Sequence, residues 1–320
     1  MLAYIVRRLL FMIPTLFLVT VIVFGTIRFI PGSAIELMVA EYAQESGEGA
    51  DYTAEDLRKA LGLDTPIYIQ YAQWIGQIVR LDLGESLWTG RNVIEDLGKR
   101  LPVTFELGIF ALITALTMAL PIGVYTAIRQ DTAGDYIGRS IAILAICLPS
   151  FWLATLIIVF PSIWWGWSPP IDLPSLREDP MGNLKSFIIP GAVLGFALSG
   201  VTMRMTRAMM LEVLRQDYIR TAWAKGLKEK IVIIRHALKN ALIPVITLIG
   251  LQVPILIGGT VVLEQIFVLP GMGLLMFEAV NQRDYPIITG LMLFMGMFIL
   301  VINLVVDMSY GYLDPKVRYQ

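Results

Sequence analysis

Residues 218–244 read YIRTAWAKGLKEKIVIIRHALKNALIP, a basic and helix-prone segment between two long apolar runs. The first part predicts a short helix over 218–225, with Asp217 as its N-cap and Gly226 as the left-handed residue that ends it. A second predicted helix begins near Glu229 and continues into the following apolar run. Two helices joined by a glycine form a stiff corner that can dock into the groove of a soluble partner. The alternative is an amphipathic loop that binds anionic lipid headgroups.

The composition of the chain places this segment in a membrane protein. Of the 320 residues, 56% are hydrophobic and 16% are charged, and the mean hydropathy is +0.69, too apolar for an ordinary soluble domain. The formal net charge is -1, so overall basicity gives no indication of nucleic acid binding. We therefore expect an all-α integral membrane protein, because every backbone amide within lipid needs a partner in its own segment.

Six apolar stretches are long enough to cross a bilayer, whose core of about 30 Å requires about 20 helical residues. We expect a cytoplasmic N-terminus and first span over 1–29, an outer loop over 30–102 and a membrane core over 103–320. One stretch of this core is broken by Pro149 and Pro161. The core is expected to contain spans at 103–128, 140–165, 186–206, 241–263 and 285–306, a cytoplasmic coupling segment at 207–240 and a cytoplasmic tail at 307–320.

Lysine and arginine in the loops predict the orientation, because positive charge resists translocation across the membrane. Arg7 and Arg8 precede the first span, which places the N-terminus in the cytoplasm. The loop at 30–102 then lies outside and carries twelve acidic against six basic residues, whereas residues 204–240 lie inside with nine basic against three acidic residues. Both termini are therefore expected in the cytoplasm.

The outer loop is long enough to contain helices of its own. Thr53 can cap a short helix that ends near Gly62, and Pro66 can open a second one. One face of the second helix is apolar, and it either lies on the membrane surface, caps the bundle or docks an external protein. That face consists of Ile67, Tyr71, Trp74, Ile75 and Ile78.

The 320 residues contain little that points to catalysis. The phosphate-binding pattern G-x-x-x-x-G-K-[ST] is missing, and Gly98-Lys99 is followed by Arg100 rather than by a hydroxyl residue. The only histidine, His236, has no cysteine or carboxylate at ligand spacing, so we expect no metal and no cofactor in this chain. The chain should therefore not hydrolyse ATP by itself and is not expected to be an enzyme.

Charged residues are also scarce inside the predicted spans. Ion-driven carriers use buried titratable groups as relays, yet the nearest acids here, Glu106 and Glu264, lie close to the outer ends of their spans. This favours a pathway driven by another protein over a self-powered carrier. Gln252 and Asn303 are the polar residues deeper in the membrane, where they either line the translocation pathway or form hydrogen bonds between helices.

Several motifs resemble one family over nearly the whole chain. Residues 218–226 and the sequence HALKNALIP at 236–244 are similar to the coupling motif of ABC-transporter permeases, in the variant of the dipeptide/oligopeptide/nickel import family. The general permease motif has a glutamate six residues before the glycine, and Arg220 stands there, as is usual in the peptide branch. Further motifs that resemble this branch are PG at 31–32, LGLD at 61–64, DLGES at 82–86, LPSFW at 148–152, EQIF at 264–267, PGMG at 270–273, RDYP at 283–286 and DP at 314–315.

The resemblance implies the fold of a type I ABC importer permease in the prokaryotic cytoplasmic (inner) membrane, and the long outer loop looks like that of the first of two permeases. It also implies a homologous second permease, an extracytoplasmic substrate-binding protein and two cytosolic ATPases, which bind the ATP and Mg²⁺. The motif assigns the ATPase contact to Tyr218, Ile219, Arg220, Thr221, Ala222, Lys225 and Gly226.

The cargo stays open at this point. Di- or oligopeptides are expected, but nickel, glutathione-like compounds and oligosaccharides use the same architecture. Passive channels, ion-coupled carriers and membrane receptors or scaffolds are the alternatives from other functional classes.

Overall fold

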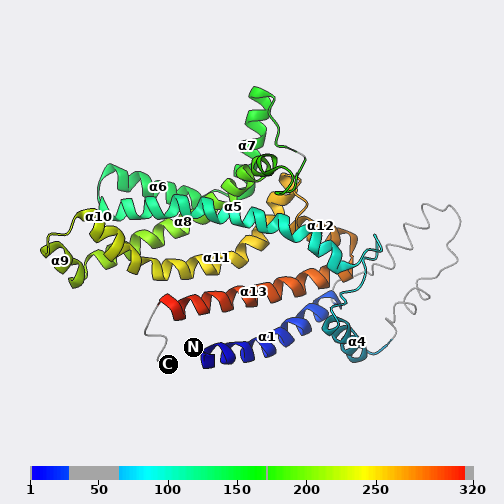
Figure 1. Cartoon of the computed structure of the whole chain (residues 1–320). Coiled ribbons are helices and arrows are strands. Elements are labelled where there is room, and N and C mark those ends of the chain that lie inside the picture. Colours follow the sequence, from blue (N-terminus) through cyan, green and yellow to red (C-terminus); the bar gives the residue numbers. More distant parts are fainter. Residues whose placement is uncertain (1, 29–64, 171, 314–320) are drawn as a thin grey trace. The chain divides into compact units, whose positions relative to one another are not determined.

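The computed structural model describes residues 2–28, 65–170 and 172–313. In these residues every regular element is helical apart from one isolated antiparallel bridge between Glu85 and Asn92 (Figure 1). The all-α class expected from the composition is therefore confirmed for the described part of the chain. The helix predicted after Thr53 lies outside the described residues.

Among the described residues, five helices are long and apolar enough to cross a membrane, and a bent pair of shorter helices makes a sixth span if counted as one. The five long helices are α1 (Leu2–Arg28), α5 (Val93–Ile128), α8 (Pro180–Leu214), α11 (Lys239–Ile266) and α13 (Tyr285–Leu313). The bent pair is α6 (Ala133–Cys147) and α7 (Ser150–Trp165). The shorter elements are α4 (Ile67–Val79), α9 (Asp217–Ala224), α10 (Glu229–Ile231), a π-helical segment (Val232–Leu238) and α12 (Met272–Gln282).

The span predicted at 140–165 is not one straight helix. α6 ends at Cys147, α7 begins at Ser150, and the two are bent by 97°. Pro149 disfavours helical geometry at the preceding residue, and Leu148 is accordingly extended, with φ -80° and ψ 120°. Pro161, which was also expected to break the span, lies inside α7 without ending it.

Other helices extend beyond the apolar stretches that predict them. α5 begins at Val93, inside the predicted outer loop, and α8 runs to Leu214, inside the predicted segment 207–240. A hydropathy window detects only the apolar stretch of a helix, so the polar turns at the helix ends are missed. The start of α8 is fixed by Asp179, whose side chain accepts hydrogen bonds from the first backbone N–H groups of the helix.

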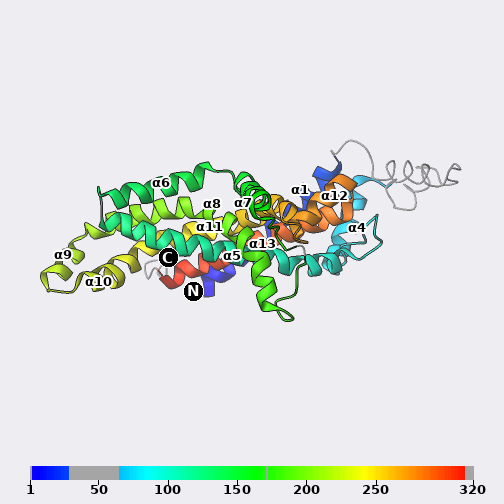
Figure 2. The same cartoon turned by 90° about the horizontal axis from the view of Figure 1, so that it is seen from above.

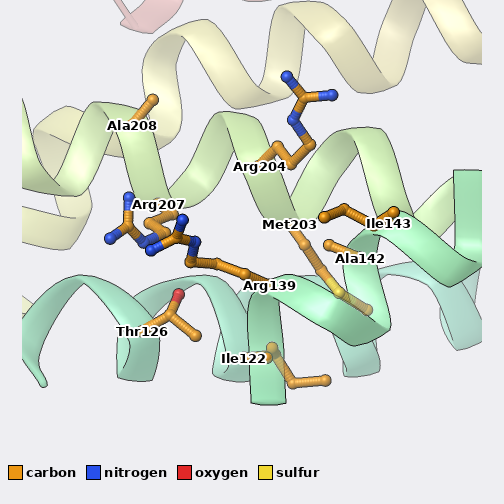
Figure 3. Close-up of a pocket in the computed structure, with 10 residues that line it drawn as sticks. Ile122, Thr126, Arg139, Ala142, Ile143, Met203, Arg204, Arg207 and Ala208 are labelled. Carbon is orange, nitrogen blue, oxygen red and sulfur yellow. The ribbon is translucent and has the colours of Figure 1, made fainter. Parts of the chain in front are cut away.

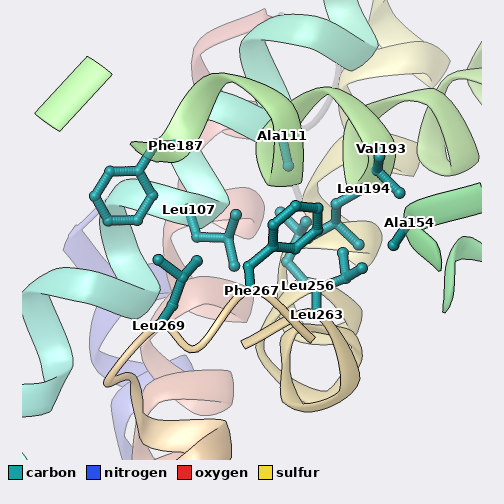
Figure 4. Close-up of a cluster of buried hydrophobic side chains, with 10 residues drawn as sticks. All are labelled: Leu107, Ala111, Ala154, Phe187, Val193, Leu194, Leu256, Leu263, Phe267 and Leu269. Carbon is teal, nitrogen blue, oxygen red and sulfur yellow. The ribbon is translucent and has the colours of Figure 1, made fainter. Parts of the chain in front are cut away.

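The chain divides into two compact units, of which the first contains Pro102–Leu274 and the residues from Val301 onward. This unit is built around α8, which packs against α6 and α11. The contact with α6 is close, because a Cβ atom at Gly200 would lie only 2.7 Å from the carbonyl oxygen of Ala142. A buried apolar cluster joins α5, α7, α8, α11 and the turn after α11 (Figure 4): Leu107, Ala111, Ala154, Phe187, Val193, Leu194, Leu256, Leu263, Phe267 and Leu269.

In the second unit, which contains Leu2–Leu101 and Leu275–Leu300, α4 packs against α1. Tyr71 Oη lies 2.9 Å from Thr20 Oγ1, and the Tyr71 ring lies edge-on to Phe24 with their centroids 5.3 Å apart. The aromatic face predicted for this helix therefore covers α1. The remaining residues of that face are Trp74, Ile75 and Ile78, which are half-buried, and Ile67, which is exposed.

Two of the motifs found in the sequence, DLGES at 82–86 and RDYP at 283–286, meet within the second unit. Ser86 Oγ donates to Asp284 Oδ2 at 2.5 Å, and the Leu87 N–H donates to Oδ1 at 3.3 Å. Asp284 is only 1% exposed, so its carboxylate needs these donors. The pairing ties the turn before α5 to the turn before α13.

Candidate functional site

The predicted coupling segment forms a helical corner at one end of the first unit, where α9 and α10 lie beyond the ends of α8 and α11 (Figures 1 and 2). We use the term helical corner for residues 217–231. From Glu229, α10, the π-helical segment and α11 continue as one helical run to Ile266, as predicted. The π-helical turns at 232–238 were not predicted. Such turns are rare and frequently lie at functional sites.

The inner face of α9 is buried. Ile219 is fully buried and Ala222 is 6% exposed. Burial of an isoleucine side chain contributes about 2 kcal/mol, so this contact holds the short helix on the bundle. Ile219 and Ala222, which the motif assigns to the ATPase contact, are therefore anchoring residues in this structure. Their buried neighbours come from α5, α8 and the helical run after Glu229: Ala127, Met210, Val232, Ile233, Ala237 and Ala241.

The outer face of α9 carries aromatic and basic side chains. The side chain of Arg220 is 75% exposed, and Tyr218 and Trp223 are each 44% exposed. Trp223 was missed among the candidate residues. It follows Ile219 by four residues, a spacing that places it beside the buried face, so helical periodicity gave no sign that it is 44% exposed. An exposed tryptophan beside arginine is typical of a protein interface. The other exposed candidates are Thr221, Lys225 and Gly226.

α9 ends in a Schellman motif at Gly226. The Gly226 N–H donates to the carbonyl of Trp223 at 2.9 Å, and the Leu227 N–H donates to the carbonyl of Ala222 at 3.4 Å. Gly226 has a φ of +72°, a conformation that residues with a Cβ atom rarely adopt. The predicted helix end is confirmed, and Leu227 packs against the buried cluster under α9.

The start of α9 differs from the prediction. Gln216 precedes the first helical residue, and its side chain makes no capping hydrogen bond. Asp217 is the first residue of the helix, so the predicted N-cap at Asp217 is wrong. Its carboxylate lies 3.4 Å from the Arg220 guanidinium in an exposed pair and close to the positive end of the helix dipole.

A hydrogen bond joins α9 to the helical run that follows it. Asn240 Nδ2 donates to Tyr218 Oη at 2.9 Å and to the carbonyl of His236 at 3.1 Å. The hydroxyl group of Tyr218 is thus fixed by Asn240, while the side chain stays 44% exposed. This bond and the buried cluster connect α9 to the start of α11.

The two candidate pathway residues have different surroundings. Thr202 Oγ1 on α8 lies 3.3 Å from Gln252 Oε1 on α11, and both side chains are buried. Gln252 therefore forms the hydrogen bond between helices that was the alternative to a pathway role. Asn303 is exposed on α13 and stays a predicted pathway residue.

The acidic residue near the outer end of α11 has a structural partner. Glu264 is fully buried, and its carboxylate accepts a hydrogen bond from Thr104 Oγ1 at 2.8 Å, which links α11 to α5.

A buried ion pair between α6 and α8 was not predicted. Asp135 is fully buried, and Arg207 donates from Nε and Nη2 to its two carboxylate oxygens at 3.0 and 2.9 Å. The Asp131 N–H donates to the same carboxylate at 3.1 Å. Bidentate pairing satisfies a carboxylate that burial would otherwise penalise strongly. The sequence contains both residues, but nothing in their spacing shows that they meet.

Comparison with known families decides what kind of protein carries this corner. Residues 119–319 match the family described as "Binding-protein-dependent transport system inner membrane component", and residues 1–108 match the corresponding N-terminal family. The chain belongs to this family. This inner membrane component is therefore a multi-pass protein of the cytoplasmic membrane and a permease subunit of a transport system, as the motif resemblance implied.

The inner membrane component is similar over its whole length to transport permeases. A provisionally named peptide transport system permease protein of Brucella abortus is 39% identical, and the dipeptide transport system permease protein DppB of Alkalihalophilus pseudofirmus is 38% identical. The glutathione transport system permease protein GsiC of Escherichia coli is 37% identical. Each comparison covers 100% of this chain and 100% of the relative.

The fold is also found in a solved ABC transporter. The structure described as "Crystal structure of an amino acid ABC transporter with histidines" contains a chain that matches with a TM-score of 0.51, over 68% of this chain and 94% of that chain. The sequence identity is 12%, so this similarity shows the fold alone. The ABC permease fold expected for this inner membrane component is thereby confirmed.

Proposed function

We propose that this chain is one of two homologous permeases in an ATP-driven importer of di- or oligopeptides. The observation that carries this proposal is the helical corner, whose inner face is buried in the bundle while its outer face presents Tyr218, Arg220 and Trp223. A short helix of this kind fits a groove on a cytosolic ATPase. Arginine and lysine on its rim steer the encounter.

The proposed orientation places both termini and the helical corner in the cytoplasm. The excess of basic residues at 204–240 supports this side for the corner, and the acidic segment at 30–102 supports the outer side for the loop. A substrate-binding protein delivers the cargo from the outer side, and the second permease completes the pathway.

In the proposed mechanism, ATP binding brings two ATPases together, and each of them moves one helical corner. Ile219 and Ala222 connect α9 to α5, α8 and the run into α11, so displacement of α9 moves these helices as well. The pathway between the two permeases then opens alternately to the two sides of the membrane. The hydrolytic step takes place in the ATPases, which bind ATP and Mg²⁺, and this chain performs no catalytic step.

Peptide is the proposed cargo because relatives named for peptide and dipeptide transport are 39% and 38% identical. The test is uptake by proteoliposomes that contain both permeases, the ATPases and the binding protein. We expect ATP-dependent accumulation of a labelled dipeptide, with labelled glutathione, nickel and an oligosaccharide compared under the same conditions. Accumulation of nickel or oligosaccharide without the dipeptide would exclude the peptide assignment while retaining the importer.

The ATPase contact gives a separate prediction. Arg220→Glu reverses a charge on the exposed face of α9 without touching its buried face, and we expect ATPase recovery with the affinity-purified permease to fall about fivefold or more. The matched control is Arg177→Glu, an exposed arginine between α7 and α8 that the proposed orientation puts on the opposite side. Unchanged recovery with Arg220→Glu would remove this residue from the contact.

A further inference from the structure

A cavity of about 470 Å³ opens between α5, α6 and α8, close to the connection of α5 with α6 (Figure 3). It belongs entirely to the first unit and lies apart from the exposed face of α9. Its lining combines three arginines with apolar side chains, so it offers both positive charge and apolar surface to an occupant. The residues that matter for its chemistry are Arg139, Arg204, Arg207, Ile122, Ile143 and Met203.

The charges around this cavity do not balance. Arg207 is neutralised by its bidentate pair with Asp135, and Arg139 approaches the same carboxylate no closer than 3.8 Å. Arg204 is exposed and forms no ion pair with any residue that the structure describes. The lining therefore holds three guanidinium groups and no acidic residue, and Asp135 beside it offsets one of them, so two positive charges are left over. Such an excess between membrane helices attracts an anion.

The arginines approach the cavity from two helices. In Figure 3 the side chains of Arg139 from α6 and Arg207 from α8 converge above Thr126 of α5, and both lie within ion-pair distance of Asp135. Arg204 leaves α8 one turn earlier, and in this view its side chain points away from Arg139 and Arg207, so it lines the cavity at a separate point. Guanidinium groups arranged in this way suit the oxygens of a phosphate ester.

The remaining wall of the cavity is apolar and continues onto the outer face of α6. Ile143 lines the cavity and is also 55% exposed. Its neighbours on the outer surface of α6, Ile137 and Leu144, are 62% and 52% exposed. An occupant that fits has an anionic head beside the arginines and apolar chains along α6. A free phosphate or nucleotide would leave this apolar wall uncovered.

We propose that this cavity binds the phosphate headgroup of an anionic phospholipid, whose acyl chains lie along α6. The proposal concerns the lipid environment of the permease and depends on neither the cargo nor the ATPase contact. The lipid phosphate, with one negative charge, offsets one of the two excess positive charges of Arg139 and Arg204 and bridges α6 to α8. The Asp135–Arg207 pair orients the third guanidinium at the rim of the same site.

The experiment is native mass spectrometry of the delipidated full-length chain, titrated with phosphatidylglycerol or phosphatidylcholine. We expect phosphatidylglycerol to bind at least about tenfold more tightly than the zwitterionic lipid, since about a factor of five is expected for each arginine at a membrane surface. Arg139→Gln and Arg204→Gln should each weaken phosphatidylglycerol binding by about fivefold on the same basis. Arg129→Gln is the matched control, because it removes an exposed charge from the same connection but does not line the cavity.

A second variant tests the cavity without changing its charge. Ala208 lines the cavity and is exposed, so Ala208→Trp fills the space while all three arginines remain. We expect phosphatidylglycerol binding to be lost. Equal binding of the two lipids, or parental binding by Ala208→Trp and both glutamine variants, would overturn the proposal. Displacement of the lipid by equimolar inorganic phosphate would identify a free-phosphate site and would also overturn it.

Discussion

Arg207→Ala, with Asp135 kept, is expected to lower the free energy of unfolding by about 3 kcal/mol, because removing one partner leaves a buried charge uncompensated. Asp135 is fully buried and loses both of its hydrogen bonds from Arg207 in this variant. Arg139 lies 3.8 Å from the same carboxylate, and its side chain is 47% exposed, so it can move closer and recover part of the loss. The measurement is denaturant unfolding of the purified protein in detergent, followed by tryptophan fluorescence.

The control for this prediction is Arg204→Ala, which removes an exposed arginine from the preceding turn of α8 and should change stability by less than about 0.5 kcal/mol. The double variant Asp135→Ala with Arg207→Ala should be more stable than Arg207→Ala alone, because no buried charge remains unpaired. Arg207→Ala at parental stability would show that the ion pair does not hold α6 against α8. A double variant as unstable as the single one would attribute the loss to packing of the arginine stem.

The parts of the fold that depend on local sequence were predictable. Apolar stretches of sufficient length predicted the membrane helices, and Gly226 predicted the end of α9 because few other residues adopt a positive φ. The prediction of an N-cap at Asp217 was wrong, because Asp217 is the first residue of α9. Aspartate is favoured both at the N-cap and in the first helical turn, so the residue type does not distinguish the two positions. The start of α5 and both ends of α8 were misplaced because polar end turns carry no hydropathy signal, whereas the end of α5 at Ile128 was predicted.

The parts that depend on which helices meet were not predictable from one sequence. The pairing of Asp135 with Arg207 requires α6 to lie beside α8, and the hydrogen bond of Gln252 to Thr202 requires α11 to lie on the other side of α8. Pro149 predicted a break but not a bend of 97° between α6 and α7. The seven candidates at 218–226 likewise share one motif, and only the packed structure separates buried Ile219 from its exposed neighbours.

Gly226→Val is expected to reduce ATP-driven uptake by at least about tenfold. A backbone strain of about 2 kcal/mol at a left-handed position lowers the equilibrium constant for the native corner by more than about tenfold. Valine would have to adopt a φ of +72°. A Cβ atom at this position meets no other atom within 4 Å, so the strain comes from the backbone alone. The chain should relax out of this conformation and break the hydrogen bonds from Gly226 and Leu227 that end α9.

The matched control is Gly226→Asn, because asparagine tolerates the left-handed conformation better than any β-branched residue and should keep most of the uptake. Hydrogen exchange over residues 217–227 separates the structural step from the functional one. Faster exchange with lost uptake in Gly226→Val supports the corner as the route by which ATPase movement reaches α11. Faster exchange with parental uptake would show that the corner opens as expected but does not transmit force, and the proposed coupling would then have to be assigned to another cytoplasmic surface of the permease.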